Sequence, residues 1–335
     1  MEELPDDVLL ILMRYLRLPD LFACRVVCKR FKHLALHPDV WRHRSLKSHL
    51  AKDKPNPWVC PVLRLAPCLA ELTAELPSVG CHGQLLAMSR CAVSCLRVTA
   101  RWSGIKDAAF MIRNQEALGR LRHLDLSFGS YDASFGKEGS LIMGVVAAAT
   151  SRLEHLNVPI FRVDSYELAA SSVSHCLITN SSLRSLKCPL TPSSEPFSKT
   201  ILTAHSSTLE VVRFSLIEFK ATPWTNAGAG PLLASMPHLR KLLSPLLPGM
   251  ESGPACESLT QVDLFLQPDT PACARAAVGV LRRAKQLSKV VLHFSVASPA
   301  HISADLLADL AAGRSRATVN TLVVSLPEER DELPG

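Results

Sequence analysis

The chain has 335 residues, of which 47% are apolar and 20% charged, and its formal net charge is +7. This apolar fraction is typical of a packed protein and too high for a disordered one. The longest stretch that is both apolar and uncharged, residues 139–151, is shorter than the roughly 20 residues that a membrane helix needs. The acidic N-terminus, MEELPDD, lacks the basic and then apolar layout of a signal peptide.

The cysteine content and the charge pattern narrow the choice of compartment and partner. Eleven cysteines, an odd number, are too few for a disulfide scaffold in a chain of this length. Without a secretory signal, we expect a reducing compartment, and therefore residence in the cytoplasm, the nucleus or both. Because no run of five or more like charges occurs, we expect neither a nucleic acid nor a membrane as partner.

The first fifty residues predict a small helical module. Pro5 and the acidic pair after it favour the start of a helix with an apolar stripe, formed by Val8, Ile11, Leu12 and Leu16. Asp20 is a good N-cap for a second helix that runs to Leu34. Trp41 follows on a short third turn. A module of this size with apolar residues on more than one face of its first helix implies a partner that covers them.

A different rule governs the rest of the chain, where an apolar residue recurs at positions 1, 4 and 6 of a unit of about 28 residues. The members of this ladder are Val93/Leu96/Val98, Leu121/Leu124/Leu126, Leu153/Leu156/Val158, Leu183/Leu186/Cys188, Leu209/Val212/Phe214, Leu239/Leu242/Ser244, Leu259/Val262/Leu264, Leu287/Val290/Leu292 and Val319/Leu322/Val324. A weaker first member is Leu69/Leu72/Ala74.

Between the ladder members the apolar period changes from 2 to 3.6, as in the stripe Leu141, Val145 and Ala149. Each unit therefore predicts a strand, a loop and a helix, and such units must stack because one alone cannot bury its apolar face. Strands pack more closely than helices, so the stack bends. The sequence predicts an α/β protein in which a small all-helical module precedes a curved solenoid, with parallel strands inside and helices outside.

The expected domains are the helical module 1–50, a proline-containing linker or first cap 51–68, the solenoid 69–326 with nine or ten repeats, and an acidic tail 327–335. The ladder resembles that of leucine-rich repeats. The module resembles an F-box, whose pattern is matched by Leu4-Pro5, the apolar helix Val8 to Leu16, Asp20-Leu21, Val27-Cys28-Lys29 and Trp41, with Phe31 where many members have Trp. This combination is similar to the substrate receptors of SCF-type cullin–RING ubiquitin ligases.

The resemblance implies that the F-box binds a Skp-family adaptor and that the repeats hold a target protein for ubiquitination. Residues that face the adaptor are expected among Leu4, Pro5, Val8, Leu9, Leu12, Leu16, Leu21, Val27, Cys28 and Phe31. Spacing alone does not separate the adaptor-facing members from the internal core. A basic cluster in the same region, Arg25, Lys29, Arg30 and Lys32, is expected on the solvated side.

No catalytic signature is found: phosphate-binding, dinucleotide, zinc-protease and nucleophile-elbow motifs are all missing, as is any C-x-x-C pair. We therefore expect no enzyme activity, no cofactor and no metal. The i, i+4 spacings of Cys24/Cys28 and His33/His37 suggest a metal site. On one continuous helix, however, Cys28 and His33 would point about 140° apart, which opposes convergence on one ion. Small core cysteines and surface histidines are the favoured interpretation.

The side chains between the ladder leucines should point to the concave face. There His123 and His155 occupy equivalent places. They could be a stacked binding pair or metal ligands, but the favoured interpretation is that they are ordinary exposed residues. Basic residues of the middle repeats would form a positive band suited to an acidic or phosphorylated target segment: Arg184, Lys187, Arg213, Arg240 and Lys241. A solvated repeat face without a ligand is the favoured interpretation.

Two other functions stay open. One is a repeat scaffold that binds partners without ubiquitin transfer, which adaptor co-purification would distinguish from a substrate receptor. The other is an enzyme with its site inside the arc, but no nucleophile, base or metal motif supports this function.

Overall fold

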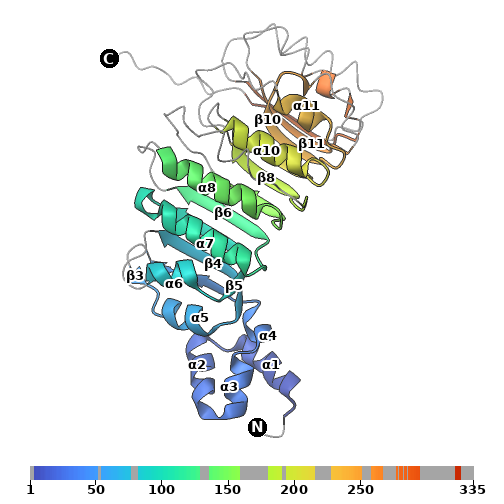
Figure 1. Ribbon diagram of the computed structural model, residues 1–335. Coiled ribbons are helices and arrows are strands. Elements are labelled where there is room, and N and C mark those ends of the chain that lie inside the picture. The colour runs from blue at the N-terminus through green and yellow to red at the C-terminus, as the bar shows by residue number, and fades with distance from the viewer. Residues whose placement is uncertain are drawn as a thin grey trace, which may run out of the picture. The chain divides into compact units, whose positions relative to one another are not determined.

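The computed structural model describes residues 4–51, 54–76, 82–128, 136–158, 180–190, 194–215, 228–250, 258–266, 277–294 without 278, 282 and 285, and 321–325. The chain divides into two compact units, Met1–Ser172 and Val173–Gly335. The first unit contains a helical head and parallel strands, and the second contains further parallel strands with helices against them (Figure 1).

The head consists of α1 (Asp6–Tyr15), α2 (Leu18–Val27), α3 (Lys29–Ala35) and α4 (Pro38–Trp41). As the sequence predicts, α1 begins directly after Pro5, with two aspartates in its first turn. The core of the head is formed by buried side chains from all four helices, Leu9, Leu10, Met13, Leu21, Leu34, Val40 and Trp41. The Trp41 indole donates a hydrogen bond to the Ala35 carbonyl at 2.7 Å, which satisfies its buried N–H.

The expected helix from Asp20 to Leu34 is two helices. Cys28 interrupts it with an extended backbone (φ −157°, ψ 169°), and its Sγ accepts a hydrogen bond from the Phe31 amide at 3.4 Å. Cys28 is therefore the N-cap of α3. The start was also misplaced, because α2 begins at Leu18 with Pro19 in its first turn, where a missing N–H costs nothing.

The apolar stripe predicted for α1 is not the face that packs against the other helices. Val8, Ile11 and Leu12 are exposed, whereas Leu9, Leu10 and Met13 are buried. The first helix has apolar residues almost all around, so periodicity could not choose the face that the other helices cover.

The head continues directly into the sheet. The strand β1 (Ser45–Lys47) pairs in parallel with β4 (Cys68–Leu76), with Leu46 opposite Leu72. The segment expected as a linker or first cap contains the short strand β3 (Lys54–Pro55), which pairs with β2 (His49–Ala51), and the helix α5 (Val59–Leu65). This segment is packed onto its neighbours: Trp58 stacks on Phe22 of the head at 5.5 Å between ring centroids, and Asn56 Nδ2 donates to the Lys47 carbonyl at 2.9 Å.

The sheet of the first unit continues from β4 through β5 (Ala92–Ala100) and β6 (His123–Phe128) to β7 (His155–Asn157), all parallel. The fourth ladder position is in register across these strands, so that the buried residues Leu72, Leu96, Leu124 and Leu156 follow one another. The strands that the ladder predicts are thus confirmed here.

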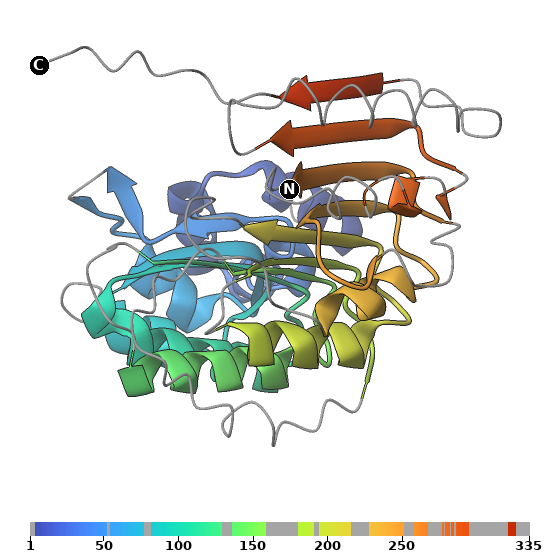
Figure 2. The same cartoon turned by 90° about the horizontal axis from the view of Figure 1, so that it is seen from above.

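Helices cover one face of this sheet: α6 (His82–Met88), α7 (Ile105–Ala117), after the short helix η1 (Trp102–Gly104), and α8 (Gly136–Ala149) (Figure 2). Buried Gln115 of α7 accepts a hydrogen bond from the Val93 amide and donates one to the Cys91 carbonyl, so it joins the helix to the start of β5. In α8 the buried side chains include Ile142 and Val146, whereas Leu141 of the predicted stripe is exposed.

The second unit repeats this design with β8 (Ser185–Pro189), β9 (Val211–Ser215), β10 (Lys241–Pro245), β11 (Gln261–Leu266), β12 (Lys289–Phe294) and β13 (Thr321–Ser325). Each pairs in parallel with the next, and the ladder residues Leu186, Val212, Leu242, Val262, Val290 and Leu322 share one register. The helices α10 (Glu195–His205) and α11 (Ala229–Ala234) lie on one side of these strands (Figure 2). A helical head followed by an α/β region with a parallel sheet is therefore the fold.

None of the helices in the described ranges has the length and apolarity needed to cross a membrane.

Candidate protein-interaction surfaces

Exposed apolar side chains concentrate in the head. Of the thirteen large apolar side chains exposed among the described residues, seven lie within residues 4–27. We call these seven the apolar head surface: Leu4, Val8, Ile11, Leu12, Tyr15, Val26 and Val27. Tyr15 and Val26 are 84% and 86% exposed, and Leu12 is 50% exposed. Such a density of uncovered apolar side chains on α1, on α2 and just before α1 is typical of a protein-binding surface.

The structure sorts the ten residues that were expected to face an adaptor. Six are exposed (Leu4, Pro5, Val8, Leu12, Val27 and Cys28), and Leu16 and Phe31 are half-buried. Leu9 and Leu21, at 3% and 0% exposure, belong to the internal core instead, because α1 and α2 turn these side chains toward the other helices. Ile11, Tyr15 and Val26 were missing from the expected set, although Ile11 stood in the predicted stripe.

The N-terminus of α1 is tied to α3 by an ion pair. The Arg30 guanidinium lies 2.6 Å from Asp6 Oδ1 and also donates to the Leu4 carbonyl. The prediction that Arg30 points to the solvated side with its basic neighbours is therefore corrected. Because Leu4 and Val8 flank Asp6, this ion pair holds the first residues of the apolar head surface against α3.

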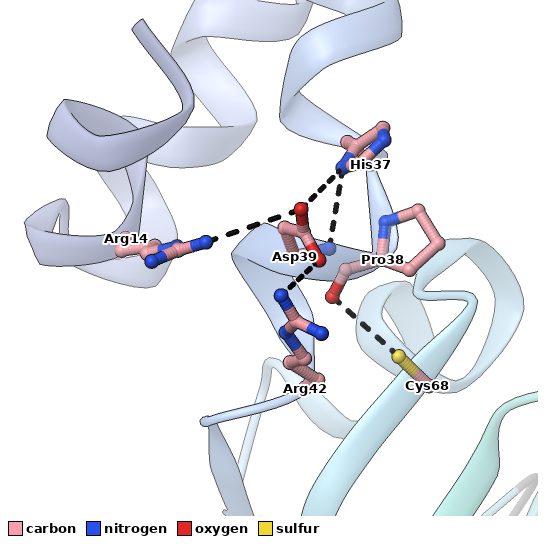
Figure 3. Close-up of polar contacts among 6 residues, drawn as sticks. All are labelled: Arg14, His37, Pro38, Asp39, Arg42 and Cys68. Carbon is pink, nitrogen blue, oxygen red and sulfur yellow. Dashed lines mark hydrogen bonds and ion pairs between the residues drawn. The ribbon is translucent and has the colours of Figure 1, made fainter. Parts of the chain in front are cut away.

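A second polar cluster fixes α4 to its neighbours (Figure 3). Asp39 Oδ1 lies 2.5 Å from the Arg42 guanidinium, and its Oδ2 lies 3.9 Å from that of Arg14 on α1. The Asp39 amide donates to His37 Nδ1 at 3.3 Å, and the Cys68 thiol of β4 donates to the Pro38 carbonyl at 3.6 Å. These contacts connect the head to the first long strand of the sheet.

Arg44 strengthens the same junction at the C-terminal end of α1. Its guanidinium donates to the carbonyls of Met13 (2.8 Å), Leu16 (2.9 Å), Arg14 (3.2 Å) and Val40 (2.9 Å). Three of these carbonyls lie at the C-terminal end of α1, where a cation also complements the helix dipole. Burial lowers the pKa of this guanidinium.

The four possible metal ligands of the head, Cys24, Cys28, His33 and His37, are not brought together as one site. Cys24 lies on α2, Cys28 caps α3, and His37 is engaged with Asp39. Burial, with Asp20 as a smaller cause, raises the pKa of the Cys24 thiol, which disfavours the thiolate that a metal needs. In the described ranges no group of three or more metal-ligating side chains is found.

On the sheet of the first unit, the face opposite the helices is polar and largely paired within itself. His123 and His155 stack at 4.4 Å between ring centroids, and burial together with the neighbouring His155 lowers the pKa of His123. On the same sheet Arg97 lies 3.1 Å from Glu71, and Asn157 donates to Asp125 at 2.7 Å. The two histidines are therefore stacked, with His155 exposed and His123 half-buried, and a binding role for them stays a prediction.

The corresponding polar face of the second unit is different, because it carries an excess of cations. All five residues of the predicted basic band are exposed: Arg184, Lys187, Arg213, Arg240 and Lys241. Lys289 on β12 is a sixth cation, and the described carboxylates nearby are Glu210 and Asp263. Glu210 lies 3.6 Å from Arg184. Lys187 and Arg213 lie directly opposite each other on β8 and β9.

Comparison with known families identifies the head. Residues 1–47 match the model of the F-box-like family, which covers α1 to α4 and β1. The head is an F-box-like domain. F-box domains typically bind adaptors of the Skp family, so the match indicates a role in protein–protein interaction for the head. No curated protein matches the chain.

Proposed function

We propose that this protein is a non-catalytic substrate receptor of an SCF-type cullin–RING ubiquitin ligase, working in the cytoplasm, the nucleus or both. The F-box-like domain would bind a Skp-family adaptor, and the α/β region would hold the target protein. The observation that carries the proposal is the apolar head surface on a domain of this family. We further propose that residues 69–326 are leucine-rich repeats in a curved solenoid, which the shared register of the ladder residues supports.

Two leucines of α1 test the adaptor surface. Leu12 is 50% exposed and Leu9 is 3% exposed, although both carry the same side chain on the same helix. Leu12→Asp would place an unpaired charge in the complex but in solvent when the head is free, so adaptor affinity should fall at least 100-fold, about 3 kcal/mol, with the fold intact. Leu9→Asp should instead unfold the head. Leu141→Asp, on an equally exposed leucine of α8, is the matched control.

Adaptor binding is measured by co-expression with the full chain, followed by a titration of purified components, and folding is followed by circular dichroism. Wild-type chain that does not co-purify with an adaptor, or a Leu12→Asp chain that binds as wild type does, would contradict the receptor proposal. The first result would favour a repeat scaffold outside the ubiquitin pathway, which is the alternative function.

The target side of the proposal rests on the basic band of the second unit. An acidic or phosphorylated segment is the target chemistry that complements six exposed cations with two carboxylates beside them. Replacing Arg184, Lys187 and Arg213 together with Glu should abolish target capture by the chain in proteasome-inhibited cells, while adaptor binding persists. Unchanged capture would exclude this face as the target site.

A further inference from the structure

The basic band contains one pair of cations whose arrangement is unfavourable without a ligand. Lys187 of β8 and Arg213 of β9 are register partners in a parallel pair, and both side chains are exposed on the polar face. Neighbouring strands are roughly 4.8 Å apart, so the two side chains start about that far from each other. Like charges placed opposite each other destabilise a sheet.

No described residue neutralises this pair. Glu210, one residue before β9, lies 3.6 Å from Arg184, which accounts for its charge. Residues that are register partners across neighbouring strands form a row. Asp263 lies in the same row as the pair, but Leu243 of β10 stands between Asp263 and Arg213. The positive charge of the pair is therefore uncompensated among its described neighbours.

The same row of the first unit shows how such a position is normally balanced. There Arg97 stands opposite Asp125, and Asp125 stands opposite Asn157, which donates a hydrogen bond to it. Arg97 is also 3.1 Å from Glu71. The two rows share their place in the repeat, so repeat geometry alone does not explain adjacent cations in the second unit.

We propose that Lys187 and Arg213 form a two-cation subsite for a phosphorylated side chain of the target. This inference rests on the proposed receptor function. A phosphate monoester carries a charge of about −1.5 to −2 near neutral pH. Two cations therefore balance a phosphate better than they balance a single carboxylate, which carries one negative charge. The Arg213 guanidinium can bind two phosphate oxygens at once, and the Lys187 ammonium supplies a point charge beside it.

The subsite is tested on the full chain with inorganic phosphate as the probe. Lysines are labelled by reductive ¹³C-dimethylation, which keeps their charge, and the Lys187 signal is assigned by its loss in Lys187→Gln. Titration with phosphate, with chloride replaced to hold ionic strength constant, should shift the Lys187 signal saturably, and acetate should shift it at least fivefold less. Arg213→Gln should weaken the response at least fivefold, whereas Arg113→Gln, on an exposed arginine of α7 outside the basic band, should leave it unchanged.

A Lys187 signal that does not saturate, an equal response to acetate, or an unaffected response in Arg213→Gln would each overturn the subsite. A second arm separates a phosphorylated segment from free phosphate. A degenerate peptide library with a fixed central phosphoserine should bind the chain more than the same library with serine, and Lys187→Gln/Arg213→Gln should remove the difference. Equal binding of the two libraries would overturn the assignment to a target segment. Adaptor co-purification is independent of all these results, so failure here leaves the receptor proposal standing.

Discussion

Arg44 shows how one residue can join a helix end and a turn through its side chain and a strand through its backbone. Its guanidinium donates to four carbonyls, three of them at the end of α1, while its backbone carbonyl accepts from the amide of Ala70 in β4. We expect Arg44→Met to lower the free energy of unfolding by about 2–3 kcal/mol, because the carbonyls lose their charged donor and are half-buried. Urea unfolding of the full chain measures this loss.

Arg42 provides the control for that experiment. It is also an arginine of the same turn, but its guanidinium is half exposed and pairs only with Asp39 among the contacts found. Exposed ion pairs contribute roughly 0–1 kcal/mol, so Arg42→Met should cost much less. Equal losses for both arginines would show that the four carbonyl contacts are not what stabilises the junction.

The cysteines should differ strongly in reactivity. Burial raises the pKa of Cys91 and of Cys188 to about 12, so both thiols stay protonated at any pH used for alkylation. Cys28 is exposed at the cap of α3. We expect iodoacetamide at pH 8 to modify Cys28 well before Cys91 or Cys188, and a bound adaptor to protect it, as read by mass spectrometry of the peptides. Early modification of Cys188 in folded protein would contradict its burial.

At the scale of elements, strands were easier to predict than helix faces. A strand with one buried face repeats every two residues, so the ladder residues Leu96 and Leu124 were found from spacing and are register partners in the sheet. The helix α1 has apolar residues on two faces, one for the core and one left exposed, and nothing local distinguishes Leu9 from Leu12. The same ambiguity placed Leu141 of α8 on the wrong side.

The break between α2 and α3 offers a test at this scale. Sulfur is a weak acceptor, and Cys28 nevertheless caps α3 through its Sγ. Serine is among the preferred N-cap residues, so Cys28→Ser should raise the free energy of unfolding by about 0.5–1 kcal/mol. Cys24→Ser, inside α2, should bring no gain, since serine is no better than cysteine in a helix interior. A destabilised Cys28→Ser chain in thermal unfolding would argue against the capping role.

At the scale of the whole molecule, the sequence showed a helical head and an α/β region but not how they join. The expected border at residue 50 follows the F-box pattern, whereas β1, which lies within the matched residues 1–47, is already a strand of the sheet. The prolines around residue 55 predict a linker or first cap, yet Trp58 stacks on Phe22 and Asn56 donates to the Lys47 carbonyl of β1. These contacts depend on tertiary neighbours that spacing and composition do not reveal.

The shared strand has a consequence for removing the head. A chain that begins at residue 52 lacks β1, so the edge of β4 is unpaired and Leu72 loses its partner Leu46. Unpaired edges and newly exposed apolar side chains promote association between copies. We expect this truncated chain to elute as oligomers in size-exclusion chromatography, whereas the full-length Leu12→Asp chain, equally unable to bind the adaptor, should stay monodisperse. A monomeric, stably folded truncation would show that the head is an independent domain and that β1 is dispensable to the sheet.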